Sequence, residues 1–220
     1  MASESVENYL KCIYALQRDA CDRGVTTNAI AERLDTKASS VTDMLKKLRE
    51  RGWVQYKKYK GAQLTAEGER MALAIVRKHR LWEVLLVDHL GFGWDEVHHI
   101  AEQLEHVESE ALVERLDDFL GNPRFDPHGD PIPDSEGRLD EGLQRFALDT
   151  LEPGQSGLIV GVEDSSAEFL QYLDSVRLTL GVKVEVVSRF AFDRSVMLRT
   201  SEGDRQVSQA VARNLLLRKL

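Results

Sequence analysis

The segment HRLWEVLLVDHLGFGWDEVHHIAEQLEH, residues 79–106, carries two clusters of imidazole and carboxylate side chains at helical spacing. The clusters are His79 with Glu83, and His98 with Glu102, Glu105 and His106. Because a helix turns once in about 3.6 residues, each cluster occupies one face of its helix. If the two helices pack antiparallel, imidazoles and carboxylates converge without a thiolate, a ligand set that suits Mn²⁺ or Fe²⁺.

A solvated helix face is the plain alternative for any one of these pairs, since charges four residues apart on a helix interact weakly in water. Apolar residues interleave both clusters, however: Leu81, Val84, Leu85 and Val87 in the first, and Val97, Ile100, Leu104 and Val107 in the second. These apolar faces need burial, so part of each cluster lies at a boundary where crowded carboxylates require a cation.

The composition indicates a globular protein of two or three small domains. The chain has 220 residues, of which 42% are hydrophobic and 30% charged, which permits a real core. It has no run of about 18 apolar residues, and MASESVENYL lacks the basic and apolar regions of a signal peptide. Two cysteines, Cys12 and Cys21, suit no metal motif, and we expect a cytoplasmic protein.

Charge is unevenly distributed along the chain. Residues 1–70 carry 13 Lys and Arg against 10 Asp and Glu, whereas residues 71–145 carry 7 against 17. Residues 146–220 are nearly balanced, with 9 against 10. The net charge of −8 therefore conceals a basic module, which favours a nucleic-acid partner, fused to an acidic one.

The basic module has the pattern of a winged helix. Residues 4–19 are apolar at helical spacing, and residues 26–52 predict two further helices joined by a tight turn. Trp53–Tyr56 and Ala62–Leu64 alternate like strands and enclose a basic turn. A basic hairpin behind a helix-turn-helix favours DNA binding over a purely structural three-helix unit.

The second helix of this motif, starting at Ser39 or Ser40, is expected to enter the major groove of DNA by its N-terminal residues. Lysines along it and on the hairpin supply salt-dependent contacts to phosphates. Asp43 lies near the N-terminal end of this helix. Its carboxylate either accepts a hydrogen bond from a cytosine amino group or repels the DNA. The candidate DNA-binding residues are Thr27, Lys37, Ser39, Ser40, Thr42, Lys46, Lys47, Lys57, Lys58 and Lys60.

The acidic module is predicted to be helical. One helix begins at Thr65 and runs to the stop at Gly91, Trp94–Val107 carries the second cluster, and residues 109–120 form a third amphipathic helix. Apolar faces in so short a segment predict a symmetric homodimer, which matches a palindromic operator.

Residues 121–138 hold four of the five prolines and predict a turn-rich connector. His128 lies here between Asp126 and Asp130, but in a loop without helical geometry it is a weak metal candidate. Residues 139–148 predict a short helix.

The C-terminal part predicts a small β-barrel of SH3 type, with a helix over Ala167–Leu180. The short alternating strands are expected within residues 157–163, 182–190, 195–201 and 205–220. We therefore expect a mainly α protein with a small β content and three domains: a winged-helix DNA-binding domain (1–70), a helical metal-binding and dimerisation domain with the Pro-rich connector (71–145), and an SH3-like domain (146–220).

The succession of winged helix, HRLWE, EVHHIAEQLEHV, DPHGDPIP and small barrel resembles the diphtheria toxin repressor family of iron- and manganese-dependent transcriptional repressors. The likeness covers essentially the whole chain, and the barrel matches an SH3-like (FeoA-like) domain. It implies a cytoplasmic homodimer, not an enzyme, with two Mn²⁺ (alternatively Fe²⁺) per subunit. Metal binding would drive binding to a double-stranded DNA operator of metal-uptake genes. Glu102 stands where iron-type members have Cys, which favours manganese.

The resemblance also implies the ligands. The ancillary site matches His79, Glu83 and His98, and the primary site matches Glu102, Glu105 and His106. The first helix supplies one more primary ligand, Met or Asp in the family, at the position of Asn8; Glu7 is the neighbouring substitute. Lys11 stands where some members use Glu and is not expected to bind metal. The barrel lends ancillary ligands in iron-type members, and Glu168 is the candidate.

Two other functions are compatible with the residues. A metal-independent winged-helix regulator, whose barrel binds a peptide or small molecule, would bind DNA regardless of chelators. A dinuclear metallohydrolase would need an open coordination position beside a substrate cleft, and the sequence offers no other catalytic group.

Overall fold

A computed structural model describes residues 3–19, 24–57, 60–139 and 144–219. The chain divides into two compact units, and the division falls within one helix, between His79 and Arg80. The first unit comprises residues 1–79, 102–114 and 133–138, and the second comprises residues 80–101, 115–132 and 139–220.

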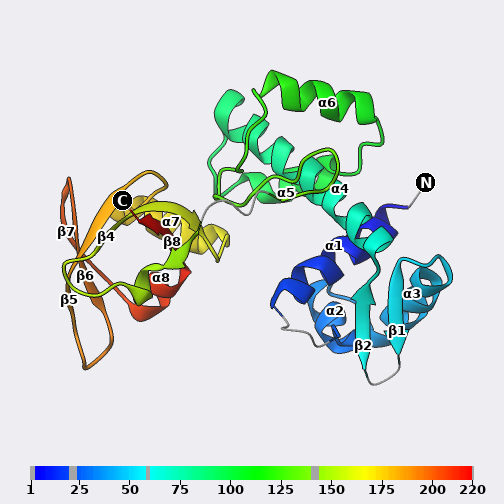
Figure 1. Ribbon diagram of the computed structural model, residues 1–220, viewed down its shortest axis with the longest axis horizontal. Helices are drawn as coiled ribbons and strands as arrows, with labels where there is room; N and C mark the ends of the chain where they lie inside the picture. The colour runs from blue at the N-terminus through cyan, green and yellow to red at the C-terminus, as the bar shows by residue number, and fades with distance from the viewer. Residues whose placement is uncertain (1–2, 20–23, 58–59, 140–143, 220) are drawn as a thin grey trace. The chain divides into compact units, whose positions relative to one another are not determined.

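The winged helix belongs to the first unit (Figure 1). Its elements are α1 (Glu4–Asp19), α2 (Thr27–Arg33), α3 (Ala38–Glu50), β1 (Val54–Lys57) and β2 (Gly61–Leu64). Ile30, Val41 and Leu45 are fully buried. Thr26 caps α2 by accepting the N–H of Ala29 at 3.1 Å. The prediction of a winged helix is confirmed, with α3 starting one residue earlier than expected.

The hairpin of β1 and β2, here called the wing, is fixed to the segment before α2 by backbone hydrogen bonds. Val25 and Ala62 exchange two N–H···O bonds of 2.8 Å each. Gly61 has φ +85°, which favours glycine, and a side chain at Gly24 would collide with the carbonyl of Lys60. The glycines therefore permit the close approach that orients the wing.

Three further helices follow. They are α4 (Ala66–Val84), which continues as the π-helical turn η1 (Leu85–His89), α5 (Val97–Leu104) and α6 (Glu110–Phe119). The single long helix predicted to stop at Gly91 thus widens over its last turn, and Gly91 follows with φ +75°. Among the described residues, the helices are too short or too polar to cross a membrane.

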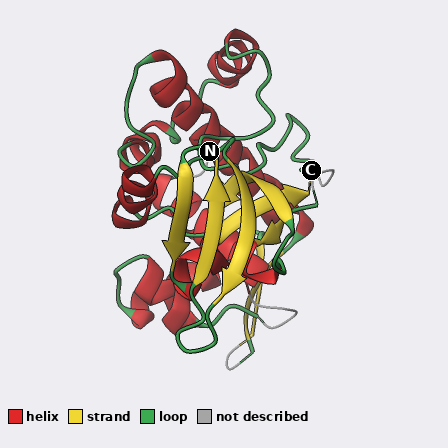
Figure 2. Ribbon diagram, turned by 90° about the vertical axis from the view of Figure 1, so that its left-hand side faces the viewer, coloured by secondary structure: helices red, strands yellow, loops and turns green. Residues whose placement is uncertain are grey.

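The C-terminal part is a six-stranded antiparallel sheet in the order β3-β8-β4-β5-β6-β7. Figure 2 draws its strands as yellow arrows. The strands are β3 (Phe146–Ala147), β4 (Ser156–Val162), β5 (Lys183–Arg189), β6 (Val196–Thr200), β7 (Gly203–Val207) and β8 (Leu215–Lys219). Helix α7 (Ala167–Val176) buries Leu170 and Leu173 in the core of this sheet. The predicted mainly α fold with a small barrel is confirmed.

Three boundaries differ from the prediction. Residues 205–220 are not one strand, because Ser208 accepts the N–H of Val211 at 3.3 Å and caps a short helix, α8 (Gln209–Asn214), between β7 and β8. Helix α7 ends early because Arg177 adopts φ 58°.

The third difference concerns the helix predicted over residues 139–148. Residues 140–143 lie outside the described part, and Phe146–Ala147 pair with β8 as a strand. A 3₁₀ turn, η2 (Leu148–Thr150), follows and buries Leu148 in the core of the sheet.

Candidate functional site

The first cluster joins α1 to the residues that follow α5, all within the first unit. Glu7 and Lys11 lie one turn apart on α1. Nδ1 of His106 lies 2.7 Å from a carboxylate oxygen of Glu7. The ammonium of Lys11 donates to Glu105 at 2.6 Å, and it lies 3.9 Å from an oxygen of Glu102. A side chain of the DNA-binding module thus contacts each of the three predicted primary ligands.

Glu105 is the most deeply buried member of this cluster, with 1% of its surface exposed. Nδ1 of His79 lies 2.5 Å from the same oxygen that accepts from Lys11. Burial alone would raise the pKa of Glu105, but the hydrogen bonds and charges of His79 and Lys11 hold this pKa below its usual value. The carboxylate is therefore ionised and needs a positive charge beside it.

The donors of this cluster are of the chemical type that divalent cations bind. They are carboxylate oxygens and imidazole nitrogens, which bind Mn²⁺ and Fe²⁺. The Lys11 ammonium already stands among them, 3.2 Å from Nδ1 of His79 and in contact with Glu105. The group is thus arranged to hold a positive charge.

Asn8 and Glu7 were alternatives for the ligand from α1, and the structure places them differently. Glu7 contacts His106. Asn8 lines a cavity of about 660 Å³ between α1 and α3, together with Ser40 and Lys47. In this conformation the side chain that reaches the cluster is that of Glu7.

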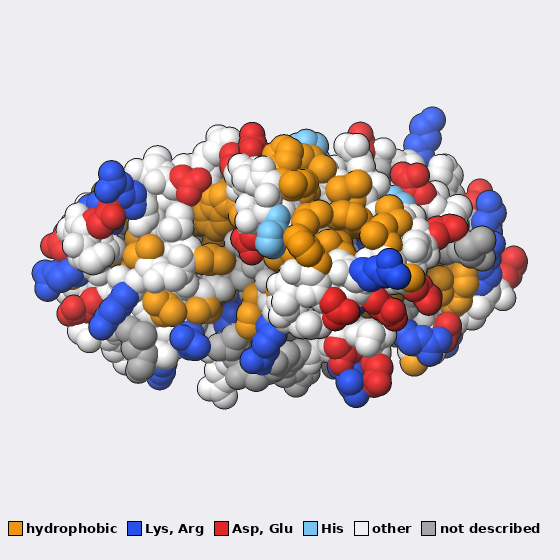
Figure 3. Space-filling model, turned by 90° about the horizontal axis from the view of Figure 1, so that it is seen from above, with side chains coloured by type: hydrophobic (Ala, Val, Ile, Leu, Met, Phe, Trp, Pro, Cys, Tyr) orange, Lys and Arg blue, Asp and Glu red, His pale blue; other side chains and the backbone are white. Residues whose placement is uncertain are grey.

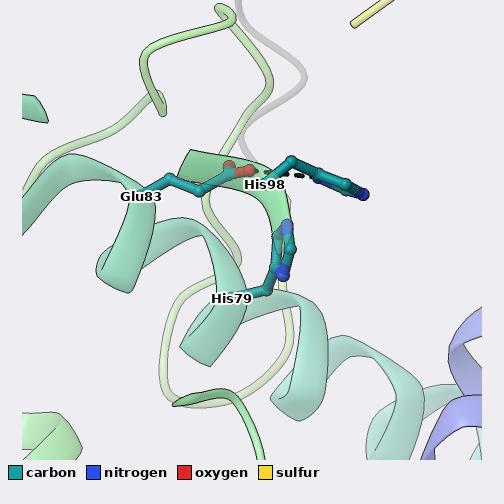
Figure 4. A group of neighbouring side chains, drawn as sticks. All are labelled: His79, Glu83 and His98. Atoms are coloured by element: carbon teal, nitrogen blue, oxygen red, sulfur yellow. Dashed lines mark hydrogen bonds and ion pairs between the residues drawn. The ribbon is translucent and has the colours of Figure 1, made fainter. Parts of the chain in front are cut away.

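The second cluster centres on Glu83 of α4, which is 1% exposed. Nδ1 of His98, from α5, lies 3.3 Å from one of its oxygens, and His79 stands one helical turn earlier on α4 (Figure 4). On the other oxygen of Glu83, Nδ1 of His128 lies at 3.6 Å. Glu168 lies exposed in the first turn of α7, and no His, Asp or Glu cluster of the described residues includes it.

His128 and Asp126, set aside as weak candidates on the sequence, are buried beside Glu83. Burial and the charge of Glu83 outweigh the guanidinium of Arg80 and raise the pKa of Asp126 to about 7. Burial alone would lower the pKa of His128, but hydrogen bonding to Glu83 and its charge, with Asp126, raise this pKa to about 9. The carboxylates of this group thus favour a positive charge at His128.

The predicted DNA-binding residues lie on α2, α3 and the wing. The exposed ones are Lys37, Ser39, Ser40, Lys46, Lys47, Lys57 and Lys60. Thr27 and Thr42 are half-buried, and Thr42 donates to the carbonyl of Ala38 at 2.9 Å. Asp43 pairs with Lys46 at 3.0 Å, which neutralises the acid at the reading end. Lys58 lies outside the described residues.

Large apolar side chains are exposed in the helical part. Leu90, Phe92 and Phe119 are 59%, 39% and 65% exposed, and Phe119 contacts the ring of His89 with centroids 4.9 Å apart. Figure 3 shows a face of the molecule on which hydrophobic side chains gather. Such a concentration is typical of a surface that another protein covers.

Three known families match successive parts of the chain. Residues 1–62 match the N-terminal DNA-binding domain of iron dependent repressors, and residues 65–134 match their metal binding and dimerisation domain. Residues 146–219 match the FeoA domain.

Individual proteins are similar as well. The iron-dependent repressor IdeR of Mycobacterium leprae (strain TN) is 40% identical over 141 residues, which is 63% of this chain and 58% of that protein. The chain thus spans less than two thirds of that relative. An uncharacterized HTH-type transcriptional regulator of Methanocaldococcus jannaschii is 37% identical over 118 residues, covering 54% of this chain and 94% of that protein.

A solved structure extends the likeness to the whole chain. It is described as a manganese-dependent transcriptional repressor in complex with manganese, and it is 34% identical with a TM-score of 0.87, covering 98% of this chain and 100% of that one. With the order of domains, the two clusters and these matches in agreement, the chain belongs to the iron-dependent repressor family, that of the diphtheria toxin repressor.

Proposed function

We propose that this protein is a metal-dependent transcriptional repressor, in which Mn²⁺, or alternatively Fe²⁺, binds at two sites per subunit and activates a homodimer for a palindromic operator of metal-uptake genes. The observation that carries the proposal is the cluster joining α1 of the winged helix to the end of α5, where Glu7 contacts His106 and Lys11 contacts Glu105. The likeness to a manganese-dependent repressor over its full length supports it.

The proposed primary ligands are Glu102, Glu105 and His106, with Glu7 from α1. Asn8 remains the alternative, which the geometry favours less because its side chain lines the cavity against α3. A carboxylate at position 102 favours manganese, since an oxygen stands where iron-type relatives have a sulfur.

The proposed ancillary ligands are His79, Glu83 and His98. Glu168 stays a weaker candidate from the barrel, because it is exposed and lies in no described cluster.

The mechanism follows from where these side chains originate. A bound divalent cation supplies two positive charges to the carboxylates of the cluster. Glu7, Glu102, Glu105 and His106 would hold the cation, its charge would offset the repulsion among the three carboxylates, and α1 would be held in one orientation. Because α1 packs within the winged helix, this orientation sets the spacing between the two copies of α3 in the dimer. The two states are the protein with α1 held in this orientation and the protein with α1 free to leave it. A free-energy difference of a few kcal/mol is enough to shift the population from one to the other.

DNA recognition is assigned to α3 and the wing. Ser39 and Ser40 at the start of α3 are exposed and short enough to meet base edges in the major groove. The exposed lysines Lys46, Lys47 and Lys60 supply contacts to phosphates.

The proposed dimer covers the exposed apolar side chains of the helical part. Leu90, Phe92 and Phe119 lie within residues 65–134, which match the metal binding and dimerisation domain of the family. An isologous interface of two copies places the two winged helices symmetrically, as a palindromic operator requires.

The test begins with duplexes enriched from a random DNA library on the protein in Mn²⁺. Fluorescence anisotropy then compares the affinity for these duplexes in Mn²⁺ and in chelator. Glu102→Ala is expected to remove the gain from Mn²⁺, whereas Glu108→Ala, an exposed acid two residues beyond His106, is expected to keep it. Equal affinity in Mn²⁺ and chelator for the unaltered protein would overturn the proposal.

One observation favours a second candidate function, a metal-independent regulator. The ammonium of Lys11 already neutralises Glu105 and links α1 to the end of α5 as a cation would. Under this alternative, DNA binding persists in chelator and is lost in a Lys11→Met variant.

A further inference from the structure

Helix α3 carries a carboxylate at the centre of its outward face. Val41, Leu45 and Leu48 are fully buried and mark the inward stripe of this helix. At about 100° per residue, Asp43 lies about 140–160° around the helix axis from each of these three residues. Its side chain is 71% exposed. An acidic group therefore occupies the middle of the surface that α3 presents to a partner.

The neighbours of Asp43 are suited to DNA. Ser39, about one turn earlier on the same face, is exposed and short. The ammonium of Lys46 lies 3.0 Å from Oδ1 of Asp43, and this positive charge offsets the repulsion between the carboxylate and DNA phosphates. Among the described residues, none donates a hydrogen bond to Oδ2 of Asp43. If α3 enters the major groove by this face, Oδ2 is the acceptor that meets the base edges.

The major-groove edges of the four bases differ in what they offer a carboxylate. Guanine presents only the acceptors N7 and O6, and thymine presents the acceptor O4 and a methyl group. Adenine presents an amino donor, but its acceptor N7 lies beside that donor and repels the second carboxylate oxygen. Cytosine presents its 4-amino donor alone. A carboxylate that loses water in the groove without gaining a donor destabilises the complex, so cytosine is the favoured base.

From this placement we propose that Asp43 is a specificity-determining residue, whose carboxylate accepts a hydrogen bond from the 4-amino group of one cytosine in each half of the operator. The inference rests on the proposed function, because it names a feature of the DNA that α3 would bind. It assigns Asp43 to base recognition, whereas the lysines of α3 contact phosphates.

The first experiment selects duplexes from a random DNA library on the full-length protein in Mn²⁺. The unaltered protein is expected to enrich a C·G pair at one position of each half-site. Asp43→Asn introduces an amide that both donates and accepts, which suits N7 and N6 of adenine. At that position the variant should therefore enrich adenine in place of cytosine, with the other positions unchanged.

Glu50→Gln is the matched control for this selection. Glu50 is an exposed acid on the same face of α3, seven residues later and at the C-terminal end of the helix. This variant should enrich the same sequence as the unaltered protein. If Asp43→Asn also enriches that sequence at every position, the inference alone is wrong. If the unaltered protein enriches no sequence in Mn²⁺, the proposed function is wrong and the inference with it.

The second experiment removes only the amino group from the DNA. In the enriched duplex, the cytosine of each half-site is replaced by 2-pyrimidinone, which lacks the 4-amino group. Fluorescence anisotropy should show an affinity about 10-fold or more lower for the unaltered protein, and no such loss for Asp43→Ala. An equal loss in both proteins would mean that the amino group acts through the DNA duplex and not through Asp43, which would contradict the inference.

Discussion

The ammonium of Lys11 lies against two of the proposed primary ligands, Glu102 and Glu105, so its removal tests whether it competes with the metal ion. Lys11 donates to Glu105 at 2.6 Å and lies 3.2 Å from Nδ1 of His79. If Mn²⁺ displaces this ammonium, the interaction stabilises only the metal-free protein. Lys11→Met should then lower the free energy of unfolding of the metal-free protein. It should make the binding of Mn²⁺ more favourable by the same amount.

The magnitude follows from the burial of the pair. A hydrogen bond to a charged group contributes about 1.5–3 kcal/mol. The Lys11 side chain is 20% exposed and that of Glu105 is 1% exposed, so water screens only part of this interaction. Lys11→Met should therefore lower the free energy of unfolding of the metal-free protein by about 1.5–3 kcal/mol. At about 1.4 kcal/mol per factor of ten, Mn²⁺ affinity should rise about 10- to 100-fold.

Urea unfolding in chelator and calorimetric titration with Mn²⁺ measure the two quantities. Lys78→Met is the matched control, because Lys78 is a half-buried lysine of α4 whose ammonium donates to the carbonyl of Val107 at 3.4 Å. An unchanged or weaker Mn²⁺ affinity in Lys11→Met would refute the displacement of Lys11 by the metal.

Three further predictions concern separate parts of the chain. Because folding lowers the pKa of Glu105 from its usual 4.5, its stabilising contribution is present above that value and is lost as the pH falls through the folded pKa. Glu105→Gln should therefore flatten the fall in metal-free stability below about pH 5, as measured by urea unfolding, and an unchanged pH slope would argue against this. Lys47→Ala on α3 should weaken binding to all duplexes and reduce the salt slope by about one, whereas Lys183→Ala on the barrel should not; equal slopes would remove α3 from the DNA surface. Gly129 has φ +87°, and a Cβ added there would collide with the carbonyl of Val160. Gly129→Ala should therefore lower the free energy of unfolding, measured in urea, by about 2 kcal/mol or more. An unchanged free energy of unfolding would show that the connector is not fixed to β4.

Helical spacing predicted both clusters because it decides which residues of one helix share a face. It does not decide which face of a second helix meets them. On α1, Glu7 and Lys11 share one face and Asn8 lies about 100° around the axis. That Glu7 contacts His106 depends on how α1 packs, which the sequence of α1 alone does not determine.

His128 escaped the sequence argument for a different reason. A loop rich in Pro and Gly has no periodicity that predicts where a side chain points. The position of His128 is fixed by Asp126, whose carboxylate accepts two backbone N–H groups, and by the hydrogen bond to Trp94. An Asp two residues before the histidine was the available signal, since Asp commonly closes such turns.

At the C-terminus, alternation of apolar residues from residue 205 to 220 concealed helix α8. Six residues of helix are too few to establish a 3.6-residue period, and Ser208 was the cap that marked its start.

The most direct test of the account is diffraction at the manganese absorption edge from crystals of the full-length protein grown in Mn²⁺. The account predicts an anomalous peak bounded by Glu102, Glu105 and His106, with the Lys11 ammonium moved away from Glu105. Crystals in which Lys11 still contacts Glu105, with no manganese peak beside Glu102, Glu105 and His106, would contradict the account.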